Sequence, residues 1–406
     1  MRPHFSSRLA GPGLPNSLSQ LRSELLREGR AVLDWSESNP RRVLPLAGLE
    51  GEDLPSLFAD PANLAYAPDP RGLLRAREAL ASLSNLPVES HFLSASTSES
   101  YSWLFKLLCD PGDAVLVPRP GYPLFDYLAG LEAVEARPWR LEYVHPGGWR
   151  VDFDSIEAAL AGGRVRALVL INPNNPTGSF INEAERAELV RIAAREGLAL
   201  IVDEVFLSFE LEGRGRSFAG EETVLTFVLD GLSKGLGLPQ LKLGWILASG
   251  PRPLLDEALA RLEIVSDSFL SAGTPVMNAL PALLERGPRF AAALGARLRR
   301  NLGELRRALE IPGSPHRVLR CEGGWTALIE SPRYRSEEEL ALGLLRDAGL
   351  WSQPGHFFDL EREAFFSAGL ILPEAAFDEG LGRYRDWFEA EGGGASRPAL
   401  GPLSML

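Results

Sequence analysis

Lys234 lies in a glycine-rich loop between two apolar runs, within the stretch from Val228 to Leu247, and Lys242 follows it in the same stretch. A lysine amine surrounded by small residues can approach a carbonyl group and condense with it to form a Schiff base. A solvated loop lysine would carry the same short string, because short motifs also occur by chance. Whether Lys234 is a nucleophile therefore depends on the groups that the rest of the chain supplies around it.

Three hydroxyl side chains, those of Ser96, Thr97 and Ser98, precede a helix that the sequence predicts from about Glu99 to Cys109. Free backbone N–H groups at the start of a helix attract anions, and neighbouring hydroxyls add donors, so the segment suits a phosphate. An ordinary N-cap, which Ser98 alone would provide, explains the same residues. The segment is a candidate phosphate site.

Two proline-bounded loops follow predicted strands, where open α/β sheets bind their ligands. Tyr122, in PRPGYP, could stack on a flat heteroaromatic ring, although an aromatic residue between prolines also makes a plain rigid turn. Asn175, in NPNNPTG, is fixed by two successive Asn-Pro turns and could present its amide to a ligand oxygen.

Asp203 ends the apolar run LALIVD. A buried carboxylate without a partner is costly, so Asp203 is either neutral or faces a cation such as a pyridinium nitrogen, although a helix cap would look the same. An anion site, a stacking aromatic, an amide, a carboxylate and a nucleophilic lysine at or near one sheet edge together predict a phosphorylated aromatic cofactor with a carbonyl group.

Strand-like apolar runs alternate with helical patterns in the middle of the chain, which predicts a largely parallel sheet buried on both faces. The runs are residues 165–171, 198–203, 223–229 and 243–248, and a helix is predicted over 183–196. Later segments mix helices with a few strands. The predicted fold class is α/β, with a three-layer αβα large domain, a mostly parallel sheet and a smaller α+β domain.

The 406 residues exceed what one hydrophobic core usually serves, which again predicts two domains. We expect an N-terminal arm and part of the small domain in residues 1–50 and a large cofactor-binding domain in 51–275. A linking helix and the small C-terminal domain are expected in 276–390, and a disordered tail in 391–406.

The composition is that of an ordinary globular protein, with 45% hydrophobic and 24% charged residues. A net charge of -12 argues against a nucleic-acid partner, because neutralising phosphates needs clustered basic residues. The sequence contains no run of 18 apolar residues, so no membrane span is predicted. Cys109 and Cys321 lie far apart without metal-ligand spacing, so we expect reduced thiols, a cytoplasmic protein and no metal site.

The motifs NPNNPTG, DEVF and SKGLGLPQLKLG, in this order and at this spacing, resemble those of the class I/II aminotransferases, which are pyridoxal-phosphate enzymes of fold type I. The resemblance runs from about Tyr66 to Trp245 and more weakly to the C-terminal helix. It implies pyridoxal 5'-phosphate as the cofactor. It also implies a biosynthetic enzyme that exchanges an amino group between an amino donor and a 2-oxo acid.

The same resemblance implies a role for each matching residue. Lys234 would form the internal aldimine with the cofactor and then shuttle a proton, while Asp203 would keep the pyridine nitrogen protonated. Asn175 would bond the 3'-oxygen, Tyr122 would stack on the ring, and a homodimer is implied by Tyr66, which would reach the neighbouring subunit's phosphate. The remaining phosphate-binding positions are Ser96, Thr97, Ser98 and Lys242.

The sequence departs from the family's pattern at several of these positions. Ser96 stands where Gly is usual, Phe206 where Tyr is usual, Gly231 where Ser is usual, and Lys242 where Arg is more frequent. The arginine that binds the substrate carboxylate should fall near Ser367, and no arginine occurs between Glu363 and Gly382. Either Arg362 reaches into the site, or the carboxylate is absent or recognised in another way.

Three functions fit these residues. The first is transamination by Lys234 and Asp203. The second is a pyridoxal-phosphate lyase or another α- or β-carbon enzyme on the same fold, because a fold does not determine a reaction. The third is a non-catalytic binding protein whose cofactor contacts have been partly lost.

Overall fold

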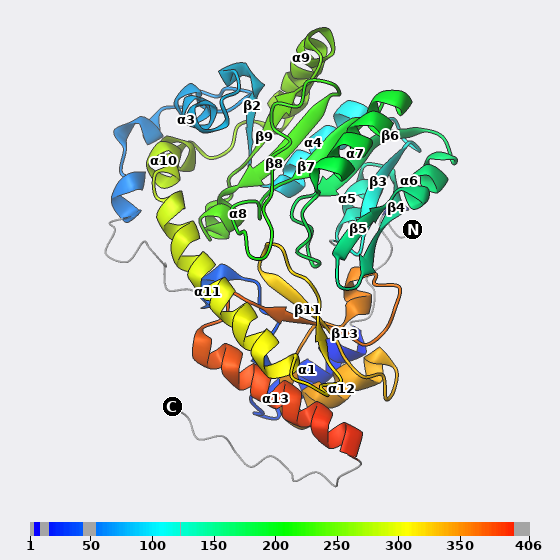
Figure 1. Cartoon of the computed structure of the whole chain (residues 1–406). Coiled ribbons are helices and arrows are strands. Elements are labelled where there is room, and N and C mark those ends of the chain that lie inside the picture. The colour runs from blue at the N-terminus through cyan, green and yellow to red at the C-terminus, as the bar shows by residue number, and fades with distance from the viewer. Residues whose placement is uncertain (1–3, 9–15, 44–53, 122, 394–406) are drawn as a thin grey trace.

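An eight-stranded sheet forms the centre of the larger part of the molecule, with the strand order β2-β9-β8-β7-β6-β3-β4-β5 (Figure 1). The computed structural model describes residues 4–8, 16–43, 54–121 and 123–393. The strands are β2 (His91–Ser94), β3 (Ala114–Arg119), β4 (Glu135–Val144), β5 (Gly148–Asp152), β6 (Val165–Ile171), β7 (Ala199–Asp203), β8 (Thr226–Gly231) and β9 (Gly244–Ser249).

The strands from β4 through β3, β6 and β7 to β8 pair in parallel, and the outer pairs β4–β5, β8–β9 and β9–β2 are antiparallel. Parallel neighbours need a crossover of a dozen or more residues, which helices such as α7 (Glu183–Glu196) provide. Between β8 and β9 the chain forms only the short α8 (Leu232–Gly235) and a 3₁₀ turn at Pro239–Leu241, so β9 returns antiparallel.

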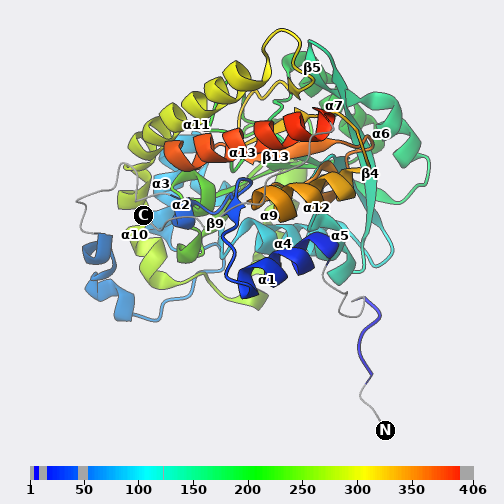
Figure 2. The same cartoon turned by 90° about the horizontal axis from the view of Figure 1, so that it is seen from below.

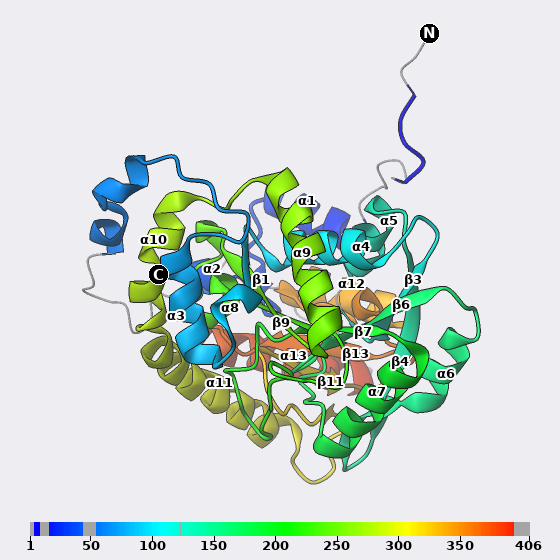
Figure 3. The same cartoon turned by 90° about the horizontal axis from the view of Figure 1, so that it is seen from above.

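Both faces of the central sheet are buried. In β7, Ile201 packs on one face, and Leu200 and Val202 pack on the other. Helices α4 (Thr97–Leu108), α5 (Phe125–Leu131) and α9 (Arg252–Phe269) cover the first face, whereas α6 (Phe153–Leu160) and α7 contribute to the core of the second (Figure 3). The predicted α/β fold with a mostly parallel sheet sandwiched between helices is confirmed.

A three-stranded antiparallel sheet, β10 (Arg317–Val318), β11 (Thr326–Glu330) and β13 (Phe365–Gly369), centres the smaller part of the molecule. Helices α1 (Ser17–Arg27), α12 (Glu337–Ala348) and α13 (Glu374–Gly393) pack around it, and β1 (Leu33–Asp34) pairs with β12 (Leu350–Trp351) (Figure 2). The chain therefore returns its N-terminal segment to a part that is otherwise built from its last hundred residues. The domain boundaries themselves stay a prediction.

The helix α11 (Gly287–Leu309) runs from the larger part to the smaller one, next to α10 (Thr274–Leu284) (Figure 1). The other short elements are α2 (Pro40–Val43), α3 (Leu74–Ser84) and 3₁₀ turns at Leu54–Phe58, Pro61–Leu64, Val88–Ser90 and Gly355–Phe358. In the described ranges, none of the helices has both the length and the apolar character needed to cross a bilayer.

Several sequence predictions differ from the observed elements. Strands β2, β4 and β5 were not expected, because β4 contains Pro138 and exposed charged residues and lies near a sheet edge, where apolar periodicity is weak. The predicted tail is wrong at its start, since residues 391–393 belong to α13. Residues 1–3, 9–15 and 44–50 of the predicted N-terminal segment, and residues 394–406, lie outside the described residues.

Candidate active site

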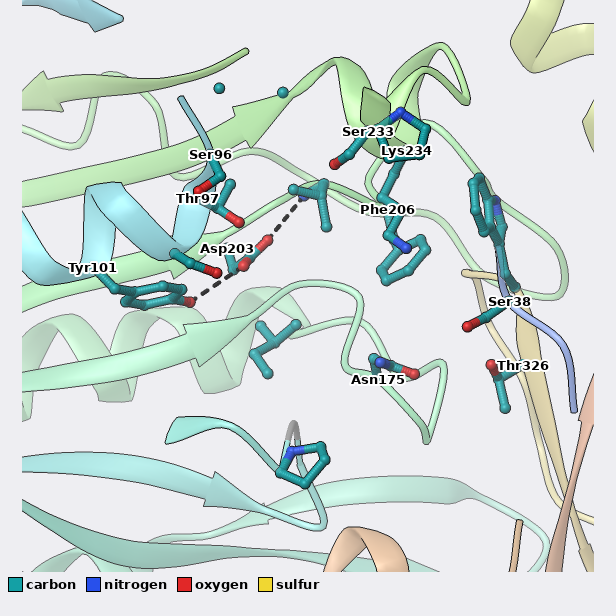
Figure 4. Close-up of a pocket in the computed structure, with 18 of the residues that line it drawn as sticks. Ser38, Ser96, Thr97, Tyr101, Asn175, Asp203, Phe206, Ser233, Lys234 and Thr326 are labelled. Carbon is teal, nitrogen blue, oxygen red and sulfur yellow. Dashed lines mark hydrogen bonds between the residues drawn. The ribbon is translucent and has the colours of Figure 1, made fainter. Parts of the chain in front are cut away.

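A cavity of about 450 Å³ opens between the carboxyl ends of β6, β7 and β8 and the β11–β13 sheet (Figure 4). Its polar lining residues are Ser36, Ser38, Ser96, Thr97, Ser98, Tyr101, Asn175, Asp203, Ser233, Lys234, Lys242, Thr326 and Gln353. Most of the residues selected from the sequence therefore meet in one place. In the part of the chain that the structure describes, no group of three or more His, Cys, Asp or Glu side chains could hold a metal ion.

Lys234 reaches the cavity from α8, the single helical turn that follows β8. Its Nζ lies 5.5 Å from the ring centroid of Phe206 and 5.2 Å from that of Trp325, and the two rings meet edge to face. Within the described residues Lys234 has no hydrogen bond or ion pair. Burial lowers the pKa of the Lys234 amine, and the charge of Asp203 opposes this shift only in part. An amine in these surroundings is uncharged, and therefore nucleophilic, at lower pH than an ordinary lysine.

We expect this lowered pKa to be measurable in the protein without cofactor. Lys234 should be modified by an acylating reagent at a pH where ordinary lysines are still protonated. Asp203→Asn should move the modification of Lys234 to still lower pH, because it removes the nearby negative charge that raises the amine's pKa. The chain has only two other lysines, Lys106 and Lys242, so peptide mass spectrometry over a pH series resolves each site. An Asp203→Asn midpoint at or above that of the wild type would contradict this electrostatic coupling.

Asp203 ends β7 and turns its carboxylate into the cavity. One oxygen accepts a hydrogen bond from the backbone N–H of Val205 at 3.2 Å, and the other accepts one from the hydroxyl of Tyr101 at 3.3 Å (Figure 4). Burial nevertheless raises the pKa of Asp203 to about 6, against the lowering effects of these bonds and of Lys234. A cationic group in contact with Asp203 would relieve this penalty.

Tyr101 was not predicted as a site residue. It lies one helical turn after Thr97 in α4, so the two side chains share a face of the helix. That spacing is the only sequence signal that could have pointed to it. Its role as a partner of Asp203 depends on α4 packing beside β7.

The candidate phosphate site lies where α4 begins. The helix starts at Thr97, and its N-cap is Ser96, whose hydroxyl accepts a hydrogen bond from the N–H of Glu99 at 3.2 Å. The expectation that Ser98 could cap the helix is therefore wrong. Gly244 lies so close to this turn that an added Cβ would be 3.1 Å from the backbone nitrogen of Thr97. The start of β9 thus closes one side of the site, and Lys242 lines the same cavity.

The NPNNPTG loop uses its two central asparagines differently. Asn174 is buried: its amide donates to the carbonyl of Pro120 at 3.3 Å and its oxygen accepts from the hydroxyl of Thr177 at 2.9 Å. Asn175 instead lines the cavity and makes no side-chain hydrogen bond within the described part of the chain (Figure 4). The loop is therefore rigid at Asn174 and available to a ligand at Asn175, as expected.

Two described residues selected from the sequence, Tyr66 and Arg362, are not brought into this cavity. Tyr66 is 84% exposed and does not line it, and Tyr122 lies outside the described residues. Arg362 forms an ion pair with Glu330 at 3.2 Å and lies over the ring of Phe365, facing a different groove. The option that Arg362 reaches into the site is therefore wrong.

Arg362→Ala should leave the KM for every amino donor within about twofold of the wild type, because its ion pair is exposed and far from the reacting groups. Steady-state kinetics with several donors test this expectation. A rise in KM that is confined to donors with a carboxylate would place Arg362 in substrate binding after all.

The residues in the cavity fit pyridoxal 5'-phosphate. The backbone N–H groups of Thr97 and Ser98 have no partner in the described structure and, with Lys242, suit the phosphate. Asp203 is a buried acid without a contacting cation and suits the ring nitrogen, and Asn175 suits the ring oxygen. The unpaired amine of Lys234 suits the aldehyde.

Comparisons with known proteins agree with this chemistry. The model of the family "Aminotransferase class I and II" matches residues 30–367. Nicotianamine aminotransferase B of Hordeum vulgare is 31% identical over 272 residues, which cover 61% of this chain and 49% of that protein. S-alkyl-thiohydroximate lyase SUR1 of Arabidopsis thaliana is 32% identical over 235 residues, covering 55% of this chain and 49% of that protein. The chain thus matches about half the length of these two curated relatives.

Among solved structures, an alanine aminotransferase from Pyrococcus furiosus superposes with a TM-score of 0.81 at 22% identity, covering 92% of this chain and 96% of that one. At this level of identity the likeness shows the fold alone.

Proposed function

The chain belongs to the class I and II aminotransferase family, whose members use pyridoxal phosphate, and we propose that it transfers an amino group from an amino donor to a 2-oxo acid. The observation that carries the proposal is that a partly buried amine without a hydrogen bond in the described residues, Lys234, and a partly buried carboxylate, Asp203, line one cavity. The first group suits covalent chemistry with a carbonyl, and the second suits a cationic ring.

In the overall reaction the donor carbon loses its amino group and one hydrogen and becomes a carbonyl carbon. The carbonyl carbon of the 2-oxo acid gains both and becomes an amine, so the donor is oxidised and the acceptor is reduced by the same two electrons. The acceptor's oxygen leaves as water, and a water molecule supplies the oxygen of the new carbonyl group. Pyridoxal phosphate, when bound, supplies an aldehyde and an electron-accepting ring.

The residues of this chain bind, orient and move protons. Lys234 Nζ lies near the rings of Phe206 and Trp325. It takes a proton from the donor carbon and later delivers a proton to the carbon of the 2-oxo acid that receives the amino group. Asp203 keeps a proton on the ring nitrogen, and Tyr101 and the Val205 N–H fix the carboxylate in place. The aromatic rings also shield Lys234 from part of the solvent, which strengthens these electrostatic interactions.

The experiment is a half-reaction followed by its reverse. Holoenzyme is mixed with one amino donor from a panel, and the absorption of the bound cofactor is followed; a 2-oxo acid is then added. Loss of the initial spectrum with each effective donor, and recovery with the 2-oxo acid, is the expected result. Release of ammonia or of a β-substituent without such recovery would identify a lyase, and no change with any donor would favour a binding protein.

We also infer a cytoplasmic homodimer. Exposed apolar side chains lie on two segments, residues 64–71 and 263–270. An ion pair between Arg71 and Glu263 joins these segments. The exposed apolar side chains are Leu64, Tyr66, Ile264 and Leu270. A second copy that covers them would bring Tyr66 towards the other subunit's site, and light scattering of wild type and Tyr66→Ala tests the assembly. The free thiols of Cys109 and Cys321 support a reducing compartment, which fractionation of the source cells can test.

A further inference from the structure

The cavity has two ends of different chemistry. Ser96 and Thr97 lie at the end where α4 begins, whereas Ser38 and Thr326 lie on the opposite side (Figure 4). Lys234 and Asp203 lie between them. Because the residues near α4 suit the cofactor, the opposite end is the place for the part of the substrate that distinguishes one amine from another.

This second end is lined by neutral side chains whose hydrogen-bonding groups are not used by the protein. The hydroxyls of Ser38 and Thr326 and the amide of Gln353 line the cavity, and none of these side-chain groups has a hydrogen bond within the described residues. Hydroxyls and amides both donate and accept hydrogen bonds. They therefore complement a ligand group that also does both.

Two buried polar atoms next to this end have no partner. The indole N–H of Trp325 is buried in the cavity wall without a hydrogen bond in the described structure. The hydroxyl of Ser367 is also buried without a partner there, although Ser367 does not line the cavity. Ser367 pairs with Leu328 in the β11–β13 sheet and shares a face with Thr326, because alternate residues of a strand point to the same side. Buried polar groups are nearly always satisfied, so the unpaired N–H of Trp325 in the cavity wall points to a polar ligand.

The surroundings favour an uncharged ligand group. Phe206, Trp325 and Phe358 supply apolar walls, and burying a carboxylate beside neutral donors is unfavourable unless a cation compensates it. Among the described residues of the lining, the cationic side chains are Lys242, on the cofactor side, and Lys234, whose amine the proposed reaction requires.

We propose that the preferred amino donor carries a neutral hydroxymethyl or carboxamide group where an amino acid carries its carboxylate. This inference rests on the proposed transamination. The donor carbon exchanges its C–N and one C–H bond for a C=O bond whose oxygen comes from water, and the 2-oxo acid takes up the nitrogen and the hydrogen and releases its carbonyl oxygen as water. Both half-reactions share the cavity, so the same neutral hydrogen-bonding side chains hold the 2-oxo acid. The binding of the 2-oxo acid is therefore weak.

The experiment uses holoenzyme and matched pairs of amines: alaninol and alaninamide against alanine, and phenylalaninol against phenylalanine. Single-turnover changes in the cofactor's absorption, measured over a concentration series, give an apparent Kd for each amine. Each neutral amine should bind at least about tenfold more tightly than its carboxylate counterpart. Equal or tighter binding of the amino acids would overturn the inference.

Two variants test whether these residues recognise the substrate. Gln353→Arg introduces a guanidinium that can pair with a carboxylate, so it should reverse the preference within each pair. Gln20→Arg, on the exposed surface of α1, adds the same charge elsewhere and should leave the preference unchanged. An unchanged preference in a folded Gln353→Arg protein would contradict the assignment.

Thr326→Val is nearly isosteric and tests the inference even if Gln353→Arg does not fold. It should weaken binding of the neutral amines about fivefold, with a smaller effect on the amino acids. Equal effects on both classes would mean that Thr326 does not distinguish them. If no amine changes the spectrum although borohydride links the cofactor to Lys234, the proposed function fails; if all amines react but the acids bind as well, only this inference fails.

Discussion

Asp203→Asn should retain pyridoxal phosphate but reduce turnover by about a thousandfold or more, which corresponds to ~4 kcal/mol of transition-state stabilisation. The reason is that an amide cannot hold a positive charge on the ring nitrogen, and the electron-accepting capacity of the ring depends on that charge. Turnover by stopped flow and cofactor content by absorption after alkaline release separate catalysis from binding.

A matched control is Asp230→Asn. Asp230 lies on the neighbouring strand β8, does not line the cavity, and has its pKa raised to about 8 by burial, so it is already protonated at neutral pH. Its replacement by a neutral amide should leave turnover within a few-fold of the wild type. Wild-type rates in Asp203→Asn would show that the carboxylate of Asp203 serves only as a local cap.

Asp203→Asn should also change the stability of the protein without cofactor. The pKa of Asp203 is about 6 in the folded chain against an ordinary 3.8, so ionisation favours the unfolded state as pH rises through this window. Asp203 should therefore cost the apoprotein roughly 3 kcal/mol above pH 6, and nothing below pH 3.8. Denaturant unfolding should find apo Asp203→Asn more stable than apo wild type at pH 7.5, with the difference shrinking towards pH 4.

Lys234→Ala should lower turnover by about four orders of magnitude, because it removes the group that both attaches the cofactor and moves the proton. It should also abolish labelling: borohydride reduction of the wild-type holoenzyme should leave a pyridoxyl group on the Lys234 peptide, and reduction of the variant should leave none.

Lys106→Ala is the appropriate control for this experiment. Lys106 lies on α4 and forms an ion pair with Glu132, outside the cavity, so its removal should change neither labelling nor turnover by more than a few-fold. A pyridoxyl group found on Lys106 or Lys242 in the wild type would refute the assignment of the nucleophile.

The amino-acid sequence alone predicted the residues that we propose to carry the chemistry. Asn175, Asp203 and Lys234 each follow an apolar run that forms a strand of the sheet, β6, β7 and β8. Parallel strands end at the same edge, so residues just beyond their carboxyl ends come together whenever the strands pair in register. Local hydrophobic patterning and chain order are enough to predict such a site.

The sequence also predicted some of the helices. The helix at 183–196 was predicted with its observed bounds, Glu183–Glu196, where Asn182 caps the start and Gly197 follows the end. Short strands such as β2 and β5 were missed. Their formation depends on a neighbouring strand that supplies hydrogen bonds, and a few residues carry too little periodicity to reveal that partner.

Only the tertiary structure decided what surrounds the reacting groups. Tyr101 reaches Asp203 from another element, and Trp325 packs beside Lys234 although ninety residues separate them in the chain. Ser38 and Thr326 meet at the substrate end because the N-terminal segment joins the part of the molecule built on the β11–β13 sheet. These contacts depend on how distant elements dock, and no local repeat or turn signal encodes docking. The sequence thus predicted the proposed catalytic groups, whereas tertiary packing decided the shifts of their pKa values and the neutral lining at the opposite end of the cavity.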